Sequence, residues 1–198
     1  MLLKSKLTAM LFLASFIFIF TSTASAHCDS MEGPVVKASI KALETGNLYY
    51  VLVWVRAEDE QEIKTMFDKV NKVRTLSLEA KELADMYFFE TVVRVHRMGE
   101  GVGYTGLKPA GYQPEEGIEA ADIAIEKSSV ENILSYLDEK YHSKVKEIFD
   151  DLKSKKNYDV NGLTAGREYV ESYVLFIHYI EGLYNGEENK VEEHLHKH

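Results

Sequence analysis

His27 and Cys28 are the two residues of this sequence whose types and spacing point most directly to metal chemistry. They follow Ala24-Ser25-Ala26, which has the Ala-x-Ala pattern of a signal-peptide cleavage site. Cleavage after Ala26 makes His27 the first residue, so that its α-amino nitrogen and its imidazole can chelate one metal ion. Cys28 is the single cysteine and adds a thiolate. Nitrogen and thiolate donors favour copper or nickel, with zinc also possible, over magnesium or calcium.

Residues 1–26 predict a secretory signal peptide. Lys4 and Lys6 give a positive start, residues 7–20 are almost wholly apolar, and small residues lead to the cleavage site. The apolar run is shorter than the ~20 residues that a membrane-spanning helix needs. We therefore expect an exported protein, periplasmic or extracellular, with no membrane partner once the signal is removed.

Cys28 has two other possible roles. A lone cysteine in an exported protein can form a disulfide with a second chain, or it can be a buried thiol without a partner. A disulfide within the chain is excluded because the sequence has no second cysteine.

Two later histidines are expected to complete the metal coordination. His96 and His178 fall on the interior faces of predicted helices, and either can add an imidazole to the donors of His27 and Cys28. The alternative for each is a core histidine that hydrogen-bonds to a neighbour, which is the more frequent role of a single histidine. Noncovalent haem between His96 and His178 is a further alternative.

Glu90 and Glu181 are the expected acceptors that would orient a ligating imidazole. His178 and Glu181 have the His-x-x-Glu spacing that carboxylate-bridged metal sites use on helices. The sequence thus predicts metal ligands at His27, Cys28, His96 and His178, supported by Glu90 and Glu181.

Composition predicts a single all-α domain. The chain has 198 residues, a net charge of −9 and only three prolines, and it is rich in helix-forming residues. An acidic chain of this kind is not expected to bind nucleic acid, because phosphate contacts need clustered Lys and Arg. We expect the signal peptide at 1–26, a helical domain at 27–186 and a polar tail at 187–198, whose histidines bind metal loosely or have no role.

Apolar periodicity, caps and glycines predict a bundle of about six to seven helices. Segment 48–55 is apolar without a clean period and fits a strand or a helix, and we predict a helix because no partner strand is evident. The predicted helices are 30–46, 48–55, 58–73, 77–99, 114–125, 128–156 and 163–184.

Segment 99–114 is a long Gly-rich loop that is expected to pack on the body as a lid. It suggests an alternative function, a metal-independent module that binds a small molecule. In that case the loop and several tyrosines would line a pocket, and an arginine would hold an anion. The candidate tyrosines are Tyr87, Tyr104, Tyr112, Tyr169, Tyr173, Tyr179 and Tyr184, and the arginines are Arg94, Arg97 and Arg167.

From residue 27 to about 185, the chain resembles an uncharacterised family of exported helical proteins that begin His-Cys-Asp after signal cleavage. The segments that carry the resemblance are 33–36, 84–91, 104–110 and 176–184. The resemblance implies a helical scaffold and no particular reaction.

His27-Cys28-Asp29 also resembles the processed start of nickel superoxide dismutase, a helical bundle that binds nickel through amine, amide, imidazole and two thiolates. The sequence departs from that pattern at Glu32, where the second thiolate would fall. The histidine brace of copper oxygenases is a chemical analogy, since it needs a first-residue histidine and one more. These resemblances imply a redox enzyme acting on superoxide or another small oxidant, whereas a closed metal site would imply a carrier or sensor.

Overall fold

The computed structural model describes residues 28–187, and the predicted signal peptide, His27 and the segment 188–198 lie outside the described residues. Within 28–187 the chain forms eight α-helices, a 3₁₀ turn and no β-strand, which confirms the predicted all-α class. The elements are α1 (Pro34–Thr45), α2 (Tyr49–Leu52), the 3₁₀ turn (Ala57–Asp59), α3 (Glu60–Val73), α4 (Leu78–Gly99), α5 (Glu116–Lys127), α6 (Glu131–Tyr136), α7 (Glu139–Lys155) and α8 (Leu163–Tyr184).

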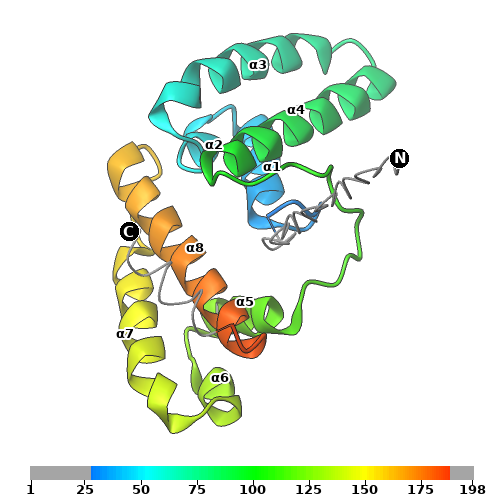
Figure 1. Ribbon diagram of the computed structural model, residues 1–198. Helices are drawn as coiled ribbons and strands as arrows, with labels where there is room; N and C mark the ends of the chain where they lie inside the picture. The colour runs from blue at the N-terminus through cyan, green and yellow to red at the C-terminus, as the bar shows by residue number, and fades with distance from the viewer. Residues whose placement is uncertain (1–27, 188–198) are drawn as a thin grey trace, which may run out of the picture.

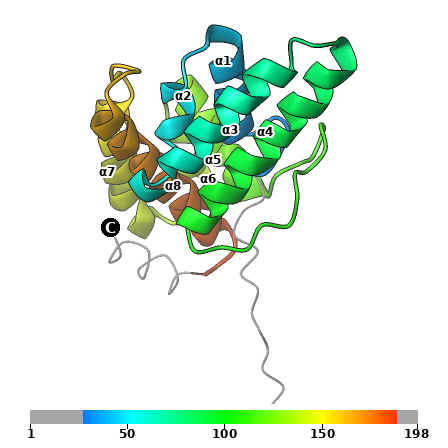
Figure 2. The same cartoon turned by 90° about the horizontal axis from the view of Figure 1, so that it is seen from above.

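The helices form two halves that lie side by side, α1–α4 in one and α5–α8 in the other (Figure 1 and Figure 2). In the first half α4 packs against α1 and α3, and in the second half α8 packs against α5 and α7. Each half has its own cluster of buried apolar side chains, centred on residues such as Phe88 and Phe176. Trp54 packs against both clusters, so it joins the two cores.

Several helix ends follow from local chemistry that is visible in the sequence. Pro34 occupies the first turn of α1, where its missing N–H costs no hydrogen bond. Gly46 ends α1 in the left-handed region at φ 71°, a conformation that favours glycine. Ser77 caps α4, because its hydroxyl oxygen accepts the N–H of Ala80 at 3.1 Å.

Two predicted helices differ from the structure. In segment 48–55 only α2 is α-helical, and the chain then turns through Val53 towards the 3₁₀ turn. Segment 128–156 is two helices, since Leu137 and Asp138 adopt extended backbone angles between α6 and α7. The apolar spacing continues across this break because residues of both helices pack into the same cluster as α8.

The Gly-rich segment runs between the halves over residues 100–115 and is held by the start of the described chain (Figure 1). The Lys108 N–H donates to the Asp29 carbonyl at 2.8 Å, and the Met31 N–H donates to the Lys108 carbonyl at 3.1 Å. Tyr104 and Leu107 pack on the first apolar cluster, which confirms that the segment packs on the body.

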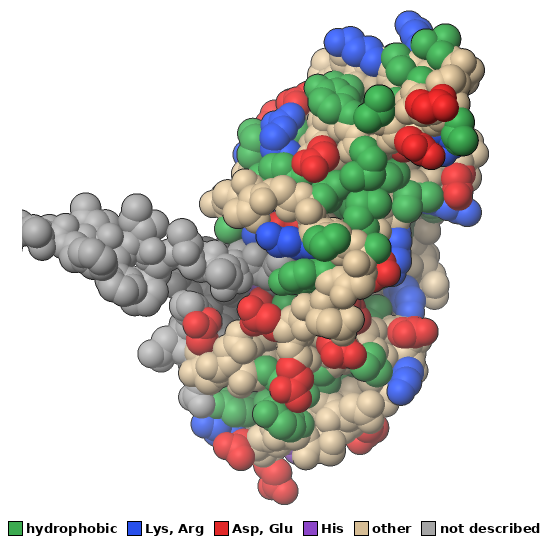
Figure 3. Space-filling view, turned by 90° about the vertical axis from the view of Figure 1, so that its right-hand side faces the viewer, with side chains coloured by type: hydrophobic (Ala, Val, Ile, Leu, Met, Phe, Trp, Pro, Cys, Tyr) green, Lys and Arg blue, Asp and Glu red, His purple; other side chains and the backbone are tan. Residues whose placement is uncertain are grey.

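One end of α4 lies at the molecular surface and the other lies at the junction of the halves. Leu76, Leu78 and Leu83 are 76%, 68% and 74% exposed at the α3–α4 turn and the start of α4. Figure 3 shows hydrophobic side chains interspersed with charged ones over this part of the molecule. The last two turns of α4 instead carry buried polar residues, which form the candidate site.

None of the helices within residues 28–187 is long and apolar enough to cross a membrane.

Candidate functional site

A buried ionic network joins the chain next to Cys28 to the end of α4. Asp29 and Arg97 are only 2% and 3% exposed. Arg97 Nε lies 3.3 Å from Asp29 Oδ1, and Arg97 Nη1 donates to Glu100 Oε2 at 2.9 Å. One guanidinium therefore holds two carboxylates, one from the amino-terminal segment and one from α4.

His96 is the predicted metal ligand that belongs to this network. It is 4% exposed, and its Nδ1 lies 2.8 Å from the backbone carbonyl of Trp54. A carbonyl oxygen only accepts hydrogen bonds, so Nδ1 must carry a proton and donate it. His96 Nε2 then faces Glu100 Oε1 at 3.4 Å.

Buried polar atoms without a hydrogen bond to the described residues gather in this network. They include Asp29 Oδ1, His96 Nε2 and Glu100 Oε1. A buried polar atom left without a hydrogen bond costs about 1–3 kcal/mol. Each such atom calls for an explanation, such as an ordered water or a bound ion, and these atoms lie at ion-pair distance, His96 Nε2 from Glu100 Oε1 and Asp29 Oδ1 from Arg97 Nε.

The thiol of Cys28 lies in an environment that opposes its ionisation. Burial raises its pKa well above the usual value, and the negative charges of Glu100, Asp29 and Asp122 raise it further, whereas Arg97 lowers it. Burial also raises the pKa of Asp29, an effect that Arg97 and His96 oppose. The thiolate of Cys28 is therefore disfavoured unless a further positive charge is brought close to it.

Residues of the second half also lie near Cys28 and His96. The Tyr173 hydroxyl donates to Asp122 Oδ1 at 3.1 Å, and its pKa is raised well above the usual value by burial and then by the charges of Asp122 and Cys28. The Trp54 ring packs edge-on against both His96 and Tyr173, with centroids 5.7 Å apart in each case. The candidate site therefore lies where the two halves meet.

His178 and Glu181 form a pair on α8. Glu181 Oε2 lies 2.8 Å from His178 Nδ1, which is the arrangement that the His-x-x-Glu spacing predicts. The contacts that the structure describes place His178 with Glu181, and the charge of His96 acts on Asp29, the residue after Cys28.

Glu90 lies on α4 and faces the Gly-rich segment. It accepts a hydrogen bond from the Tyr104 hydroxyl, so it holds the Gly-rich segment against α4. The acceptor that orients His96 is the carbonyl of Trp54. Sequence reasoning did not find this role because a backbone carbonyl carries no residue-type signal.

The described donors alone do not make a complete metal site. Over residues 28–187, no three His, Cys, Asp or Glu side chains come together closely enough to hold an ion. His27, with its predicted amine and imidazole donors, lies outside that range.

Glu100 and Asp122 are site residues that the sequence analysis missed. His96 and Glu100 are four residues apart on a helix, a spacing that puts two side chains on the same face, so this signal was available. Nothing in the sequence connects Asp122 with Cys28, because the two residues belong to different halves.

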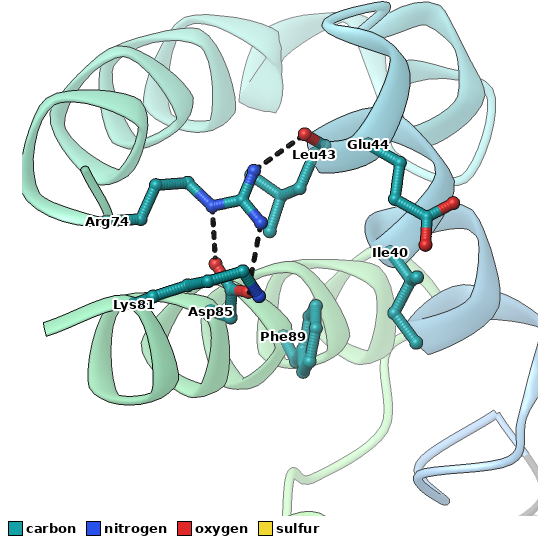
Figure 4. Close-up of a pocket in the computed structure, with 7 residues that line it drawn as sticks. All are labelled: Ile40, Leu43, Glu44, Arg74, Lys81, Asp85 and Phe89. Carbon is teal, nitrogen blue, oxygen red and sulfur yellow. Dashed lines mark hydrogen bonds and ion pairs between the residues drawn. The ribbon is translucent and has the colours of Figure 1, made fainter. Parts of the chain in front are cut away.

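The cavity drawn in Figure 4 lies between α1, the end of α3 and α4 and has a volume of about 220 Å³. Its lining includes neither a tyrosine nor a residue of the Gly-rich segment, so it is not the pocket expected for a small-molecule module. Arg74 there is held by Asp85 at 2.8 and 3.1 Å and by the Leu43 carbonyl at 2.6 Å. The lining residues are Ile40, Leu43, Glu44, Arg74, Lys81, Asp85 and Phe89.

The arginines considered as anion ligands are engaged by carboxylates. Arg94 pairs with Glu62, and Arg97 pairs with Asp29 and Glu100. Arg167 donates to Glu60 at 2.7 Å and to the carbonyls of Leu52 and Val55, so it ties α8 to the first half.

A family model described as a family of unknown function (DUF6448) matches residues 32–179. The match includes Glu90, His96 and His178 and begins after Cys28, so the resemblance of the His-Cys-Asp start to nickel superoxide dismutase stays a prediction. No curated protein and no solved structure matches the chain.

Proposed function

Since the chain belongs to a family of unknown function, its activity has to be inferred from its own residues, and we propose that it is an exported protein that binds one transition-metal ion at its mature amino terminus. The observation that carries the proposal is the buried polar network beside Cys28, in which His96 Nε2 makes no hydrogen bond to any residue of 28–187. Copper and nickel are the favoured ions, and zinc is the other candidate.

The electrostatics around Cys28 support a cation at this position. Burial, Glu100, Asp29 and Asp122 all raise the pKa of the thiol, whereas Arg97 lowers it. A bound metal ion deprotonates a coordinating thiol and compensates the nearby carboxylates. The same environment disfavours a reactive thiolate in the absence of metal.

His27 would provide its amine and its imidazole, Cys28 its thiolate and His96 its Nε2. We assign His96 rather than His178 to this set because Asp29 and Glu100 connect His96 to the Cys28 region. Glu181 would then orient His178 outside the metal sphere.

Redox catalysis would require an open coordination position, whereas a closed sphere would make the protein a carrier or sensor. Glu32, where nickel superoxide dismutase has its second thiolate, accepts the Gly111 N–H at 3.4 Å. A superoxide dismutation assay of metal-loaded protein distinguishes the two forms of the proposal.

The proposal is tested by metal content. One preparation begins at His27, a second carries one additional alanine before it, and a third carries Cys28→Ser. The tail histidines His194, His196 and His198 are replaced by alanine in all three, so that they cannot contribute metal.

Mass spectrometry should find one equivalent of copper, nickel or zinc in the preparation that begins at His27, and a loss of metal in the other two. Negligible metal in all three would overturn the proposal. Equal stoichiometric metal in all three would also overturn it, because the bound ion would then use neither the free amine nor the thiolate.

A further inference from the structure

We propose that the cavity between α1, the end of α3 and α4 binds a small monocarboxylate with a short apolar body. The cavity has a volume of about 220 Å³, and its lining includes no residue of the candidate metal site. The inference is therefore independent of the proposed metal-binding function. We refer to this cavity as the α1–α4 cavity.

The walls of the α1–α4 cavity divide into an apolar part and a charged part. Figure 4 shows Ile40 and Phe89 beside each other, and Arg74 and Lys81 grouped around Asp85. Sites for small molecules usually combine apolar walls with a few polar groups that fix the orientation of the ligand. The two parts of this lining match the two ends of an apolar acid.

The charged part of the lining carries one positive charge in excess. Asp85 accepts from Arg74 Nε at 2.8 Å, from Arg74 Nη2 at 3.1 Å and from Lys81 Nζ at 2.7 Å. Within residues 28–187 neither cation pairs with a second carboxylate. Two cations thus share one anion, and a ligand with a single negative charge would balance them.

The same two cations have hydrogen-bond donors to spare. A guanidinium has five N–H donors and an ammonium has three. Arg74 gives two to Asp85 and one to the Leu43 carbonyl at 2.6 Å, and Lys81 gives one to Asp85. The other donors make no hydrogen bond to the described residues, so they are available to the two oxygens of a carboxylate.

The volume of the α1–α4 cavity sets the size of the ligand. An apolar cavity of about 150 Å³ holds a benzene molecule. The volume of about 220 Å³ therefore suits an acid of about six to eight carbons. Leu43 and Phe89 are buried, and they would contact its apolar body.

Glu44 restricts the charge of the ligand. It lies across the cavity from Arg74 and Lys81 (Figure 4), and it forms no ion pair within the described residues. A second negative charge on the ligand would meet this carboxylate or the apolar wall, and both are unfavourable. The cavity is therefore expected to favour a monocarboxylate over a dicarboxylate or a phosphate.

The test is a titration of the isotope-labelled protein that begins at His27, followed by nuclear magnetic resonance in the presence of a metal chelator. Hexanoate is the probe. Hexan-1-ol has the same chain without the charge, and adipate has a second carboxylate at its far end. Hexanoate should shift the amide signals of Leu43, Lys81 and Phe89 until they saturate, with a Kd of about 1 mM or tighter. Hexan-1-ol and adipate should bind at least about fivefold more weakly.

Lys81→Gln removes one of the two cations and has a closely matched control. The Lys81 side chain is 49% exposed and pairs with Asp85 four residues away, whereas Lys64 is 46% exposed and pairs with Glu60 four residues away. Lys64 does not line the cavity. Lys81→Gln should weaken hexanoate binding by at least about threefold, and Lys64→Gln should leave it unchanged. Circular dichroism checks that both variants are folded.

Several results would overturn the proposal. One is the absence of saturable shifts at the cavity residues with hexanoate. Equal binding of hexan-1-ol or adipate would show that the cavity does not recognise a single negative charge. Equal hexanoate affinities of folded Lys81→Gln and Lys64→Gln would contradict the role of the excess charge.

The outcome is separate from that of the metal experiments. Cys28→Ser should bind hexanoate as the unchanged protein does, because Cys28 is not part of the lining. Failure of hexanoate to bind would leave the proposed metal-binding function standing, and loss of metal binding would leave the α1–α4 cavity unaffected.

Discussion

At the scale of single residues, the fold changes the chemistry of Cys28 more than its place in the sequence suggests. Next to a free amino terminus, a thiol would be expected to ionise readily and to be reactive. Burial and three neighbouring carboxylates oppose this by raising its pKa. This environment disfavours nucleophilic chemistry of Cys28 without metal, and the proposed metal binding would be coupled to the release of the thiol proton.

The raised pKa of Cys28 predicts how the stability of the metal-free protein depends on pH. The folded protein keeps the thiol proton at pH values where the unfolded chain, with a cysteine pKa of about 8.5, has lost it. The contribution of the Cys28 thiol to the free energy of unfolding is therefore fully present below about pH 8.5 and is lost as the pH rises towards the pKa of the folded protein. The loss reaches at most about 1.4 kcal/mol per pH unit.

The measurement is urea unfolding between pH 7 and pH 10 in the presence of a chelator, with Cys28→Ser as the control. Serine does not titrate in this range, so the free energy of unfolding of Cys28→Ser should fall less steeply with rising pH than that of the unchanged protein. Tyr173 also has a raised pKa and contributes to the slope in both proteins. Equal slopes would contradict the assignment to Cys28.

At the scale of elements, α4 positions polar residues of both the Arg74–Asp85 network and the candidate site. Its first turns pack at the α3–α4 end of the molecule, its middle carries Asp85 and Glu90, its last turn carries His96, and Glu100 is its C-cap. A single rigid helix thus connects the network of Arg74 and Asp85 to the junction where the candidate site lies (Figure 1 and Figure 4).

Asp85→Asn should destabilise the packing of α1, α3 and α4. Burial works to raise the pKa of Asp85, but hydrogen bonds from Arg74 and Lys81 lower it below the usual value. Arg74 also donates to the last turn of α1 through the Leu43 carbonyl, so the loss affects three helices. We expect a loss of about 1.5–3 kcal/mol at pH 7.

Chemical denaturation at pH 7 and at pH 3 checks this prediction. Because the folded pKa of Asp85 is depressed, its contribution is present above the unfolded pKa of about 3.9 and is lost as the pH falls through the lower folded value. The difference between Asp85→Asn and the unchanged protein should therefore shrink at acidic pH. A difference that is the same at both pH values would show that the carboxylate charge is not the cause.

At the scale of the whole molecule, the candidate site depends on how the two halves meet. Trp54 packs on both cores, and Arg167 of α8 hydrogen-bonds the carbonyls of Leu52 and Val55. Gly166 of α8 lies so close to Val53 that an added Cβ would come 2.4 Å from Val53 Cγ1. The junction is therefore closely packed over the turn between α2 and the 3₁₀ turn.

Gly166→Ala should destabilise the protein by about 1–3 kcal/mol, because the new methyl group forces the two halves apart. Replacing glycine with alanine inside a helix normally stabilises a protein by about 0.5–1 kcal/mol. A loss of stability in Gly166→Ala would therefore come from the contact of the new methyl group with the junction of the halves. Gly103→Ala is the control, since its added Cβ would meet nothing within 4 Å. Thermal unfolding of both variants tests this, and a neutral Gly166→Ala would show that the junction can relax.

The sequence by itself determined the features that depend on neighbours along the chain. The caps at Gly46 and Ser77 and the long apolar period of α8 predict helix ends correctly, because the interactions that set them span only a few residues. Residue type alone also identified His96, Cys28 and the His178–Glu181 pair as candidates. Family membership agrees with the predicted resemblance to an uncharacterised helical family.

Only the tertiary structure decided which of these groups meet. Three features have no sign in the apolar and polar pattern of the sequence. They are the extended break at Leu137, the Trp54 carbonyl that accepts from His96, and the placement of Asp122 near Cys28. These contacts join elements that are distant in the chain, and they depend on the packing of both halves against Trp54. Helix ends are set largely by neighbouring residues, whereas the charge environment of the Cys28 thiol is set by the packing of the whole molecule.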